Sequence, residues 1–298
     1  RFLPQDGSGV TERTAGVVVS TAIEEDNADL AAARRWQVPV IHRAEMLAQV
    51  ANPRRCIAVT GTSGKSTVTG MAGWIMVQAG RDPTIMNGAV MKNFVADDAP
   101  FASARVGEGG VFVSEVDESD GSIALYNPTV AVLGNVSLDH KSLEELRELF
   151  GDFLSRADVA AINLDDAETA ALAARAKALV TFAIASPDAM IGVAQGSVVE
   201  GPTSLAATVL DRRDGTAHDL ALKVPGRHNL FNALAAIAAC NAAGVPVGTA
   251  IAALASFSGL ARRFDIVGTS ARGVTVIDDF GHNPDKVAAT LATLKAHP

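Results

Sequence analysis

Short apolar runs typical of buried strands alternate with helical spacing along most of the chain. Near the start, the β-branched run at 16–20 predicts a strand, and the Ala and Leu spacing over 26–36 predicts a helix. A second strand and helix are expected at 38–41 and 44–50. Together they make a βαβ unit with one further helix, and the Asn-Pro turn signal that opens 52–55 predicts a linker after them.

A longer series of the same kind follows. It opens with a strand at 56–60, a glycine-containing loop at 61–64 and a helix at 65–79. The further elements we expect are strands at 84–86, 111–115, 130–133, 159–162 and 179–182, and helices at 143–155 and 167–176. Because helices separate most of these strands, the pattern predicts an α/β fold with a largely parallel sheet covered by helices on both faces.

The pattern changes near the end of this series. Alternating segments over 191–224, with the turn sequence Asp-Arg-Arg-Asp-Gly at 211–215, predict an antiparallel hairpin added to the sheet. Ala-rich helices are expected at 229–243 and 247–256, followed by a new strand-loop-helix unit at 274–295.

Composition narrows the class of protein. The 298 residues are 48% hydrophobic and 19% charged, as in a globular protein. No apolar stretch reaches the roughly 18 residues of a membrane span. With 25 Lys plus Arg against 33 Asp plus Glu, the net charge of -8 argues against non-specific binding to nucleic acid or anionic membranes.

Cysteine usage and the chain ends add two expectations. Cys56 and Cys240 stand in apolar surroundings without metal-ligand spacing, so we expect them in the core of a cytoplasmic protein. The chain begins without Met or a leader pattern, and its last helical pattern stops at 297–298, so we expect a piece of a longer chain. The oligomeric state stays open.

The strongest chemical signal lies between a predicted strand and a predicted helix. The segment 59–67, Val-Thr-Gly-Thr-Ser-Gly-Lys-Ser-Thr, matches a phosphate-binding loop, except that Val59 stands where the general pattern has Gly. In such a loop, backbone N–H groups and the helix dipole face phosphate, Lys65 reaches the β and γ phosphates, and Ser66 offers its hydroxyl to Mg²⁺. The alternative is a chance turn. We expect ATP phosphates to lie on Gly61, Thr62, Ser63, Gly64, Lys65, Ser66 and Thr67.

Two polar clusters follow predicted strand ends beside this loop. One runs from Glu115 to Asp120 and the other from Asn135 to His140. Because open parallel sheets place ligand-binding residues at the carboxyl ends of strands, we expect Glu115 and His140 to share a Mg²⁺ site. The alternatives are a solvated acidic turn and a structural histidine. The carboxylates expected to lie behind the metal ligands or to face solvent are Asp117, Glu118 and Asp120.

The order of these motifs resembles the Mur ligase family. The segments that carry the likeness are 61–67, 115–120, 135–140, Gly-Arg-His-Asn-Leu-Phe-Asn at 226–232, Arg-Arg-Phe at 262–264 and Asp-Asp-Phe-Gly-His-Asn-Pro at 278–284. The chain is most similar to the branch that joins L-alanine to UDP-N-acetylmuramate, including the related ligase that recycles murein tripeptide. Other branches use a carbamylated lysine after the Asp-His motif, and no Lys occurs between Lys141 and Lys177.

The resemblance implies three domains and a reaction. Residues 1–53 would be the C-terminal part of a UDP-substrate-binding domain, 54–262 the central ATP-binding domain with its P-loop-type sheet, and 263–298 the incomplete start of a Rossmann-like C-terminal domain. ATP would phosphorylate the muramyl carboxylate, and the amine of an amino acid would attack the acyl phosphate. The implied cofactors are ATP and Mg²⁺, and the implied substrates are UDP-N-acetylmuramate and an amino acid of peptidoglycan biosynthesis.

Site residues carry over position by position. The resemblance implies catalytic roles for Lys65, Glu115 and His140, with Mg²⁺ on Ser66, Glu115 and His140. The residues implied beside the adenine and at the hinge to the third domain are His228, Asn229, Asn232, Arg263, Asp279 and His282. The residues that match a loop near the sugar substrate are Asn87, Gly88, Ala89 and Lys92.

Different interpretations of the function stay open at this point. Ser63 stands where the alanine-adding branch commonly has His, so the tripeptide-recycling activity is one alternative. A non-catalytic nucleotide-binding paralogue is another. The joint presence of Lys65, Ser66, Glu115, His140 and Asp279 favours an enzyme, because a scaffold has no need of a complete metal shell.

Overall fold

The structure, a computed structural model, describes residues 2–119, 121–137, 141–281 and 284–296. The chain forms two compact units, Arg1–Pro53 and Arg54–Pro298. Strands and helices alternate through both units, and the predicted α/β class is confirmed. No helix in the described ranges is long and apolar enough to span a bilayer.

The first unit is the predicted βαβ unit with a further helix. Its elements are β1 (Val17–Val19), α1 (Ala28–Trp36), β2 (Val40–His42) and α2 (Arg43–Ala51). The strands pair in parallel, with Val17 opposite Val40. The side chain of Asn27 caps the start of α1, and Gln37, with a left-handed backbone, ends it.

The second unit is built on a large sheet with β3 (Arg55–Thr60) inside it. Parallel neighbours flank β3 on both sides: β6 (Val111–Glu115) and β7 (Val130–Leu133). Beyond β6 lie β4 (Thr84–Met86) and the antiparallel edge strand β5 (Ala104–Arg105), and beyond β7 lie β8 (Val159–Asn163), β9 (Leu179–Phe182) and β10 (Ile191–Val193). Since Arg55 already belongs to β3, the predicted linker is one residue too long.

The predicted antiparallel hairpin is confirmed at one end of this sheet. It consists of β12 (Leu205–Asp211) and β13 (Thr216–Leu222), paired from Leu205–Leu222 to Asp211–Thr216. The hairpin joins the sheet through antiparallel pairing of β12 with β10, and the short β11 (Val199–Glu200) pairs with the same strand.

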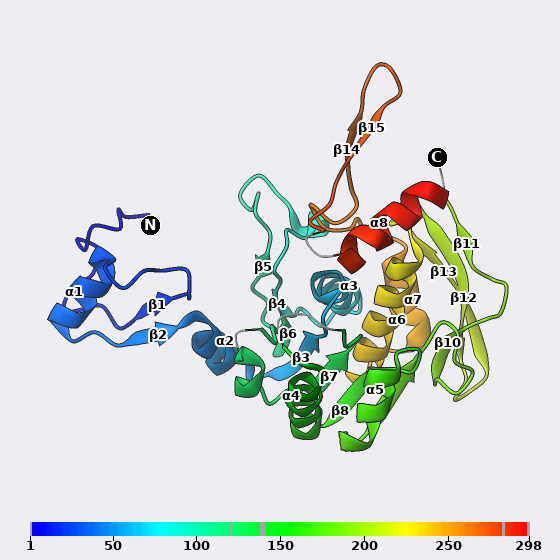
Figure 1. Ribbon diagram of the computed structural model, residues 1–298, viewed down its shortest axis with the longest axis horizontal. Coiled ribbons are helices and arrows are strands. Elements are labelled where there is room, and N and C mark those ends of the chain that lie inside the picture. Colours follow the sequence, from blue (N-terminus) through cyan, green and yellow to red (C-terminus); the bar gives the residue numbers. More distant parts are fainter. Residues whose placement is uncertain (1, 120, 138–140, 282–283, 297–298) are drawn as a thin grey trace. The chain divides into compact units, whose positions relative to one another are not determined.

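Helices cover both faces of the sheet, as predicted (Figure 1). On one face lie α3 (Lys65–Gln78), α6 (Arg227–Ala242) and α7 (Val247–Leu254), and on the other lie α4 (Leu143–Arg156) and α5 (Ala167–Leu172). Short 3-10 helices are η1 (Lys92–Phe94), η2 (Ser122–Leu125) and η3 (Ala173–Arg175). Met71 and Ile75 of α3 and Leu234 of α6 are fully buried in the core, which explains why these helices lack a polar stripe.

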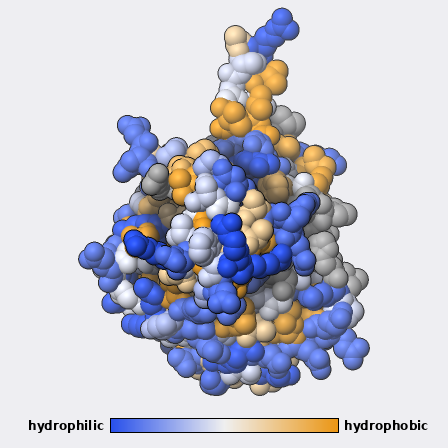
Figure 2. Space-filling view, turned by 90° about the vertical axis from the view of Figure 1, so that its left-hand side faces the viewer, coloured by the Kyte–Doolittle hydropathy of each residue, from blue (hydrophilic) through white to orange (hydrophobic). Residues whose placement is uncertain are grey.

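The last elements are a hairpin and a helix: β14 (Asp265–Thr269), β15 (Thr275–Asp278) and α8 (Pro284–Ala296). We predicted the second strand and the helix but not β14, which contains a bulge between Ile266 and Gly268 that interrupts the alternation. The apolar residues that this hairpin exposes to solvent (Figure 2) are Ile266, Val267, Val274 and Val276.

Truncating a buried ring of α4 should destabilise the protein strongly. Phe153 is 0% exposed, so Phe153→Ala should lower the free energy of unfolding by about 3–5 kcal/mol through lost burial and a residual cavity. Phe101, which is 82% exposed, is the matched control. Phe101→Ala should change the free energy of unfolding by less than about 0.5 kcal/mol. Urea titration measures both, and equal losses would contradict the described core.

Candidate active site

The loop between β3 and α3 has the backbone that anion binding requires. Gly61 (φ 129°) and Gly64 (φ 86°) adopt positive φ values that favour glycine. A Cβ on Gly64 would lie 2.5 Å from Oδ1 of Asn232. Gly64 is the N-cap of α3, and no side chain in the described part of the protein caps this helix. The first N–H groups of α3 are therefore left for a ligand.

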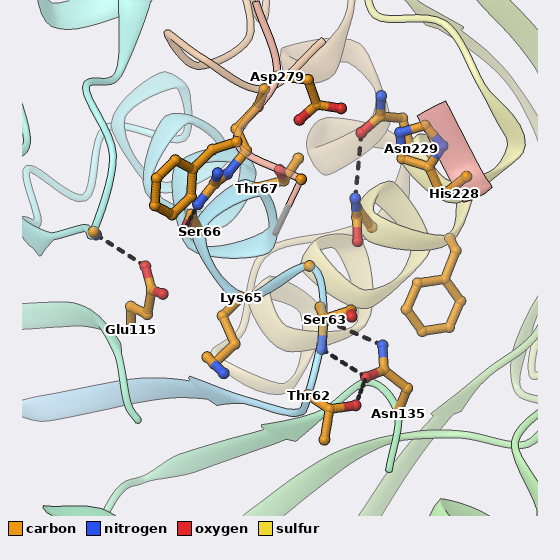
Figure 3. Close-up of a pocket in the computed structure, with 18 of the residues that line it drawn as sticks. Thr62, Ser63, Lys65, Ser66, Thr67, Glu115, Asn135, His228, Asn229 and Asp279 are labelled. Atoms are coloured by element: carbon orange, nitrogen blue, oxygen red, sulfur yellow. Dashed lines mark hydrogen bonds between the residues drawn. The ribbon is translucent and has the colours of Figure 1, made fainter. Parts of the chain in front are cut away.

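Asn135, just after β7, holds this loop in place (Figure 3). Its Oδ1 accepts hydrogen bonds from the Ser63 N–H and the Thr62 hydroxyl, both at 2.8 Å. Its Nδ2 donates to the Ser63 carbonyl at 3.0 Å, and the Thr62 N–H donates to its backbone carbonyl at 3.2 Å. Four hydrogen bonds from one residue restrict the loop to a single arrangement.

A cavity of about 660 Å³ opens in front of the loop (Figure 3). Its wall comes from the loop and first turn of α3, the ends of β6 and β7, the start of α6, the segments just before β14 and just after β15, and α8. The predicted site residues that line it are Thr62, Ser63, Gly64, Lys65, Ser66, Thr67, Glu115, His228, Asn229, Asn232, Arg263 and Asp279. The structure therefore brings together residues from widely separated motifs.

Among the described residues predicted to bind the nucleotide or Mg²⁺, Gly61 does not line the cavity. Its carbonyl accepts a hydrogen bond from Lys65 Nζ at 2.8 Å. His140 and His282 lie outside the described residues. Other residues that line the cavity had no expected role, among them Asn135, Ser137, Phe231 and Phe280. Most of these belong to the motifs themselves, so their position beside the key residues was the available signal.

Lys65 forms an ion pair with Glu118. Its Nζ lies 2.8 Å from Oε2 and 3.1 Å from Oε1 of this carboxylate. Glu118 is only 5% exposed, so of the two positions expected for it, behind the metal ligands or facing solvent, the structure excludes the second. Burial raises the pKa of Glu118, and the positive charge of Lys65 opposes that rise.

Glu115 is bound by the loop that follows β4. Its Oε2 accepts a hydrogen bond from the Gly88 N–H at 2.9 Å (Figure 3). The buried Asn87 donates to the Ser66 carbonyl at 3.0 Å, which ties the same loop to α3. Lys92, which is expected near the sugar substrate, forms an ion pair with Asp265 at 2.7 Å.

Polar side chains at the start of α6 line another side of the cavity. Asn229 donates to the Pro225 carbonyl at 2.7 Å, and Asn232 donates to Asn229 Oδ1 at 3.2 Å (Figure 3). Burial lowers the pKa of His228, so neutral imidazole is favoured there. This side of the cavity offers fixed amide groups and an imidazole whose lowered pKa favours its neutral form.

Arg263 brings a second positive charge to the cavity. Its Nη2 lies 3.4 Å from the Ser66 hydroxyl, and its guanidinium lies over the Phe280 ring at 5.0 Å. Burial lowers its pKa, and the charges of Glu115 and Asp279 oppose that shift. Its neighbours Arg262 (φ 61°) and Phe264 (φ 48°) have left-handed backbones, which are costly for residues other than glycine.

Family models match almost the whole length of the chain. The Mur ligase middle domain matches residues 59–240, the glutamate ligase domain of Mur ligases matches 262–298, and the catalytic domain of the Mur ligase family matches 2–55. The first of these alone covers more than half of the residues. The chain belongs to the Mur ligase family.

Similar proteins with known names come from the alanine-adding branch. The UDP-N-acetylmuramate–L-alanine ligase of Solidesulfovibrio magneticus is 38% identical over 290 residues, which is 94% of this chain and 60% of the relative. The ligase of the same name from Geobacter sulfurreducens is 36% identical over 94% of this chain and 60% of its own length. The chain thus spans about 60% of the length of these relatives.

Solved structures of Mur ligases have the same fold. The UDP-N-acetylmuramate–alanine ligase of Thermotoga maritima has a TM-score of 0.82 at 27% identity, covering 99% of this chain and 66% of that protein. The murein peptide ligase of Psychrobacter arcticus has a TM-score of 0.76 at 25% identity, covering 95% and 63%. The predicted resemblance is confirmed.

Removing the Asn135 side chain should loosen the phosphate loop. Asn135→Ala leaves the Ser63 N–H and carbonyl without their partner and should lower the free energy of unfolding by about 1–3 kcal/mol. Hydrogen exchange at 62–64 should accelerate. Asn135→Asp, which keeps both acceptor contacts, should lose less. An Asn135→Ala variant with unchanged stability and unchanged hydrogen exchange would contradict the role of Asn135 in holding the loop.

Proposed function

We propose that the full-length protein is an ATP-dependent ligase that joins L-alanine to the carboxylate of UDP-N-acetylmuramate through an acyl phosphate, in peptidoglycan biosynthesis. The names of the relatives support the substrates. The observation that carries the reaction type is Lys65 at the uncapped start of α3, in one cavity with Glu115 and Arg263. Two cations and free amide groups suit a triphosphate whose phosphoryl group is transferred.

The cavity fits ATP. Its volume of about 660 Å³ is in the range of small-ligand sites. The left-handed Gly61 and Gly64 turn the loop, so that the amides of residues 64–67 can meet phosphate oxygens. His228, Asn229 and Asn232 stand on another side of the same cavity and would hold the adenine.

Mg²⁺ would be held by Ser66 and Glu115, with His140 as a further proposed ligand. Hydroxyl and carboxylate oxygens are ligands that Mg²⁺ accepts, and both described side chains line the cavity. When bound, the ion neutralises charge on the transferred phosphoryl group.

The residues of this protein would position the transferred phosphoryl group and neutralise its charge, and none of them would act as a nucleophile. Lys65 and Arg263 place positive charge beside the phosphoryl group, and the amides of α3 orient it. A thiol nucleophile is neither needed nor offered: Cys56 and Cys240 are fully buried, and burial raises the pKa of Cys56 to about 12. Both thiols are free, which supports a reducing cytoplasm as the place of action.

The domain division is part of this proposal. Residues 1–53 would complete a UDP-substrate domain, 54–262 would bind ATP, and 263–298 would begin the C-terminal domain that presents the amino acid. The likeness to a murein peptide ligase makes tripeptide recycling the second candidate.

Phosphate release by the full-length protein tests the reaction. We expect release from ATP only with UDP-N-acetylmuramate and L-alanine both present, with the amide product seen by mass spectrometry. Lys65→Ala should lower kcat by about 100-fold or more, because one fixed positive charge is lost. The exposed Lys223→Ala is the control.

Other outcomes would redirect the assignment. Product with murein tripeptide, but not with L-alanine, would favour the recycling activity. ATP binding without any product would indicate a non-catalytic paralogue.

A further inference from the structure

All described polar contacts of the Lys65 ammonium are to the protein's own oxygens. Nζ lies 2.8 Å from the Gly61 carbonyl and 2.8 and 3.1 Å from the two carboxylate oxygens of Glu118. An ammonium has three donors. The group proposed to bind phosphate is thus already supplied with acceptors.

Glu118 and Lys65 are also shielded from water. The side chains are 7% and 15% exposed, respectively. Two buried charges of opposite sign stabilise each other far more than an exposed pair does, and removing one leaves the other uncompensated. The positive charge of Lys65 opposes the upward shift that burial imposes on the pKa of Glu118.

The carboxylate also has the chemistry of the expected ligand. Its two oxygens receive the ammonium as two oxygens of a phosphate would, and they carry the same sign of charge. A triphosphate on the loop and Glu118 therefore compete for the same cation. Glu115 is not the competitor, because its Oε2 accepts from the Gly88 N–H instead.

We propose that Glu118 is an internal stand-in for phosphate, which holds Lys65 in the nucleotide-free protein and must release it when a triphosphate binds. This inference rests on the proposed function of the cavity as an ATP site. Its consequence is that part of the triphosphate's interaction with Lys65 is offset by the loss of the Glu118 contact. A single phosphate or sulfate ion, with fewer contacts to the loop, would displace Glu118 poorly.

Calorimetry of the full-length protein with a non-hydrolysable ATP analogue and Mg²⁺ tests the stand-in role. Glu118→Gln keeps the length of the side chain but removes its charge, so it should bind the analogue about tenfold more tightly than the wild type. Should this variant fail to fold, as judged by its melting curve, Glu118→Asp must show tighter binding, because the shorter carboxylate reaches Lys65 less well.

Two further variants distinguish the specific Lys65–Glu118 contact from a general effect of negative charge in the cavity. Asp117 also lines the cavity but is exposed, and Asp117→Asn should change affinity by about twofold or less. In a Lys65→Met background, Glu118→Gln should produce no tightening, since the two side chains act through one contact.

Each result has one meaning. Tighter binding in Glu118→Gln that disappears in the Lys65→Met background supports the stand-in role. Equal or weaker binding in Glu118→Gln overturns it and makes Glu118 a residue that merely orients Lys65, while the ATP site itself stands. Wild-type protein that binds no analogue at all overturns the ATP site and the inference with it.

Discussion

The site depends on the register in which β3 pairs in parallel with its two neighbours, β6 and β7. Val59 lies opposite Glu115 on one side and Val132 on the other, so the three strands end together. After β6 the chain crosses to β7, which lies on the other side of β3. The carboxyl ends of these strands therefore form a topological switch point, the place where open α/β sheets bind ligands. A shift of one residue would separate Lys65, Glu115 and Asn135.

Burial strengthens the electrostatic interactions of the charged side chains in the cavity. Lys65, Glu118 and Arg263 are largely withdrawn from water, and each depends on charges supplied by other elements. Desolvation makes electrostatic interactions stronger and makes an unpaired charge costly. A site of this kind has to exchange partners when its ligand arrives, and the Lys65–Glu118 pair is the contact that such an exchange would break.

Local signals predicted much of this fold and part of the site. The run of strands and helices, the hairpin of β12 and β13 and the phosphate loop follow from periodicity and from glycine spacing. The strand β14 was missed because its bulge interrupts the alternation, and β5 was missed because two residues are too few to show one. The roles of Asn135 and Glu118 were missed for another reason: each contacts a loop more than fifty residues away, and no local pattern encodes such a pairing.

A crystal structure of the full-length protein with a non-hydrolysable ATP analogue and Mn²⁺ tests the central claim most directly. The account predicts phosphate oxygens on the backbone amides of residues 64–67, with Lys65 against them, and anomalous signal from Mn²⁺ within direct contact of Glu115. Nucleotide bound away from the β3–α3 loop, or Mn²⁺ more than one water away from Glu115, would contradict it.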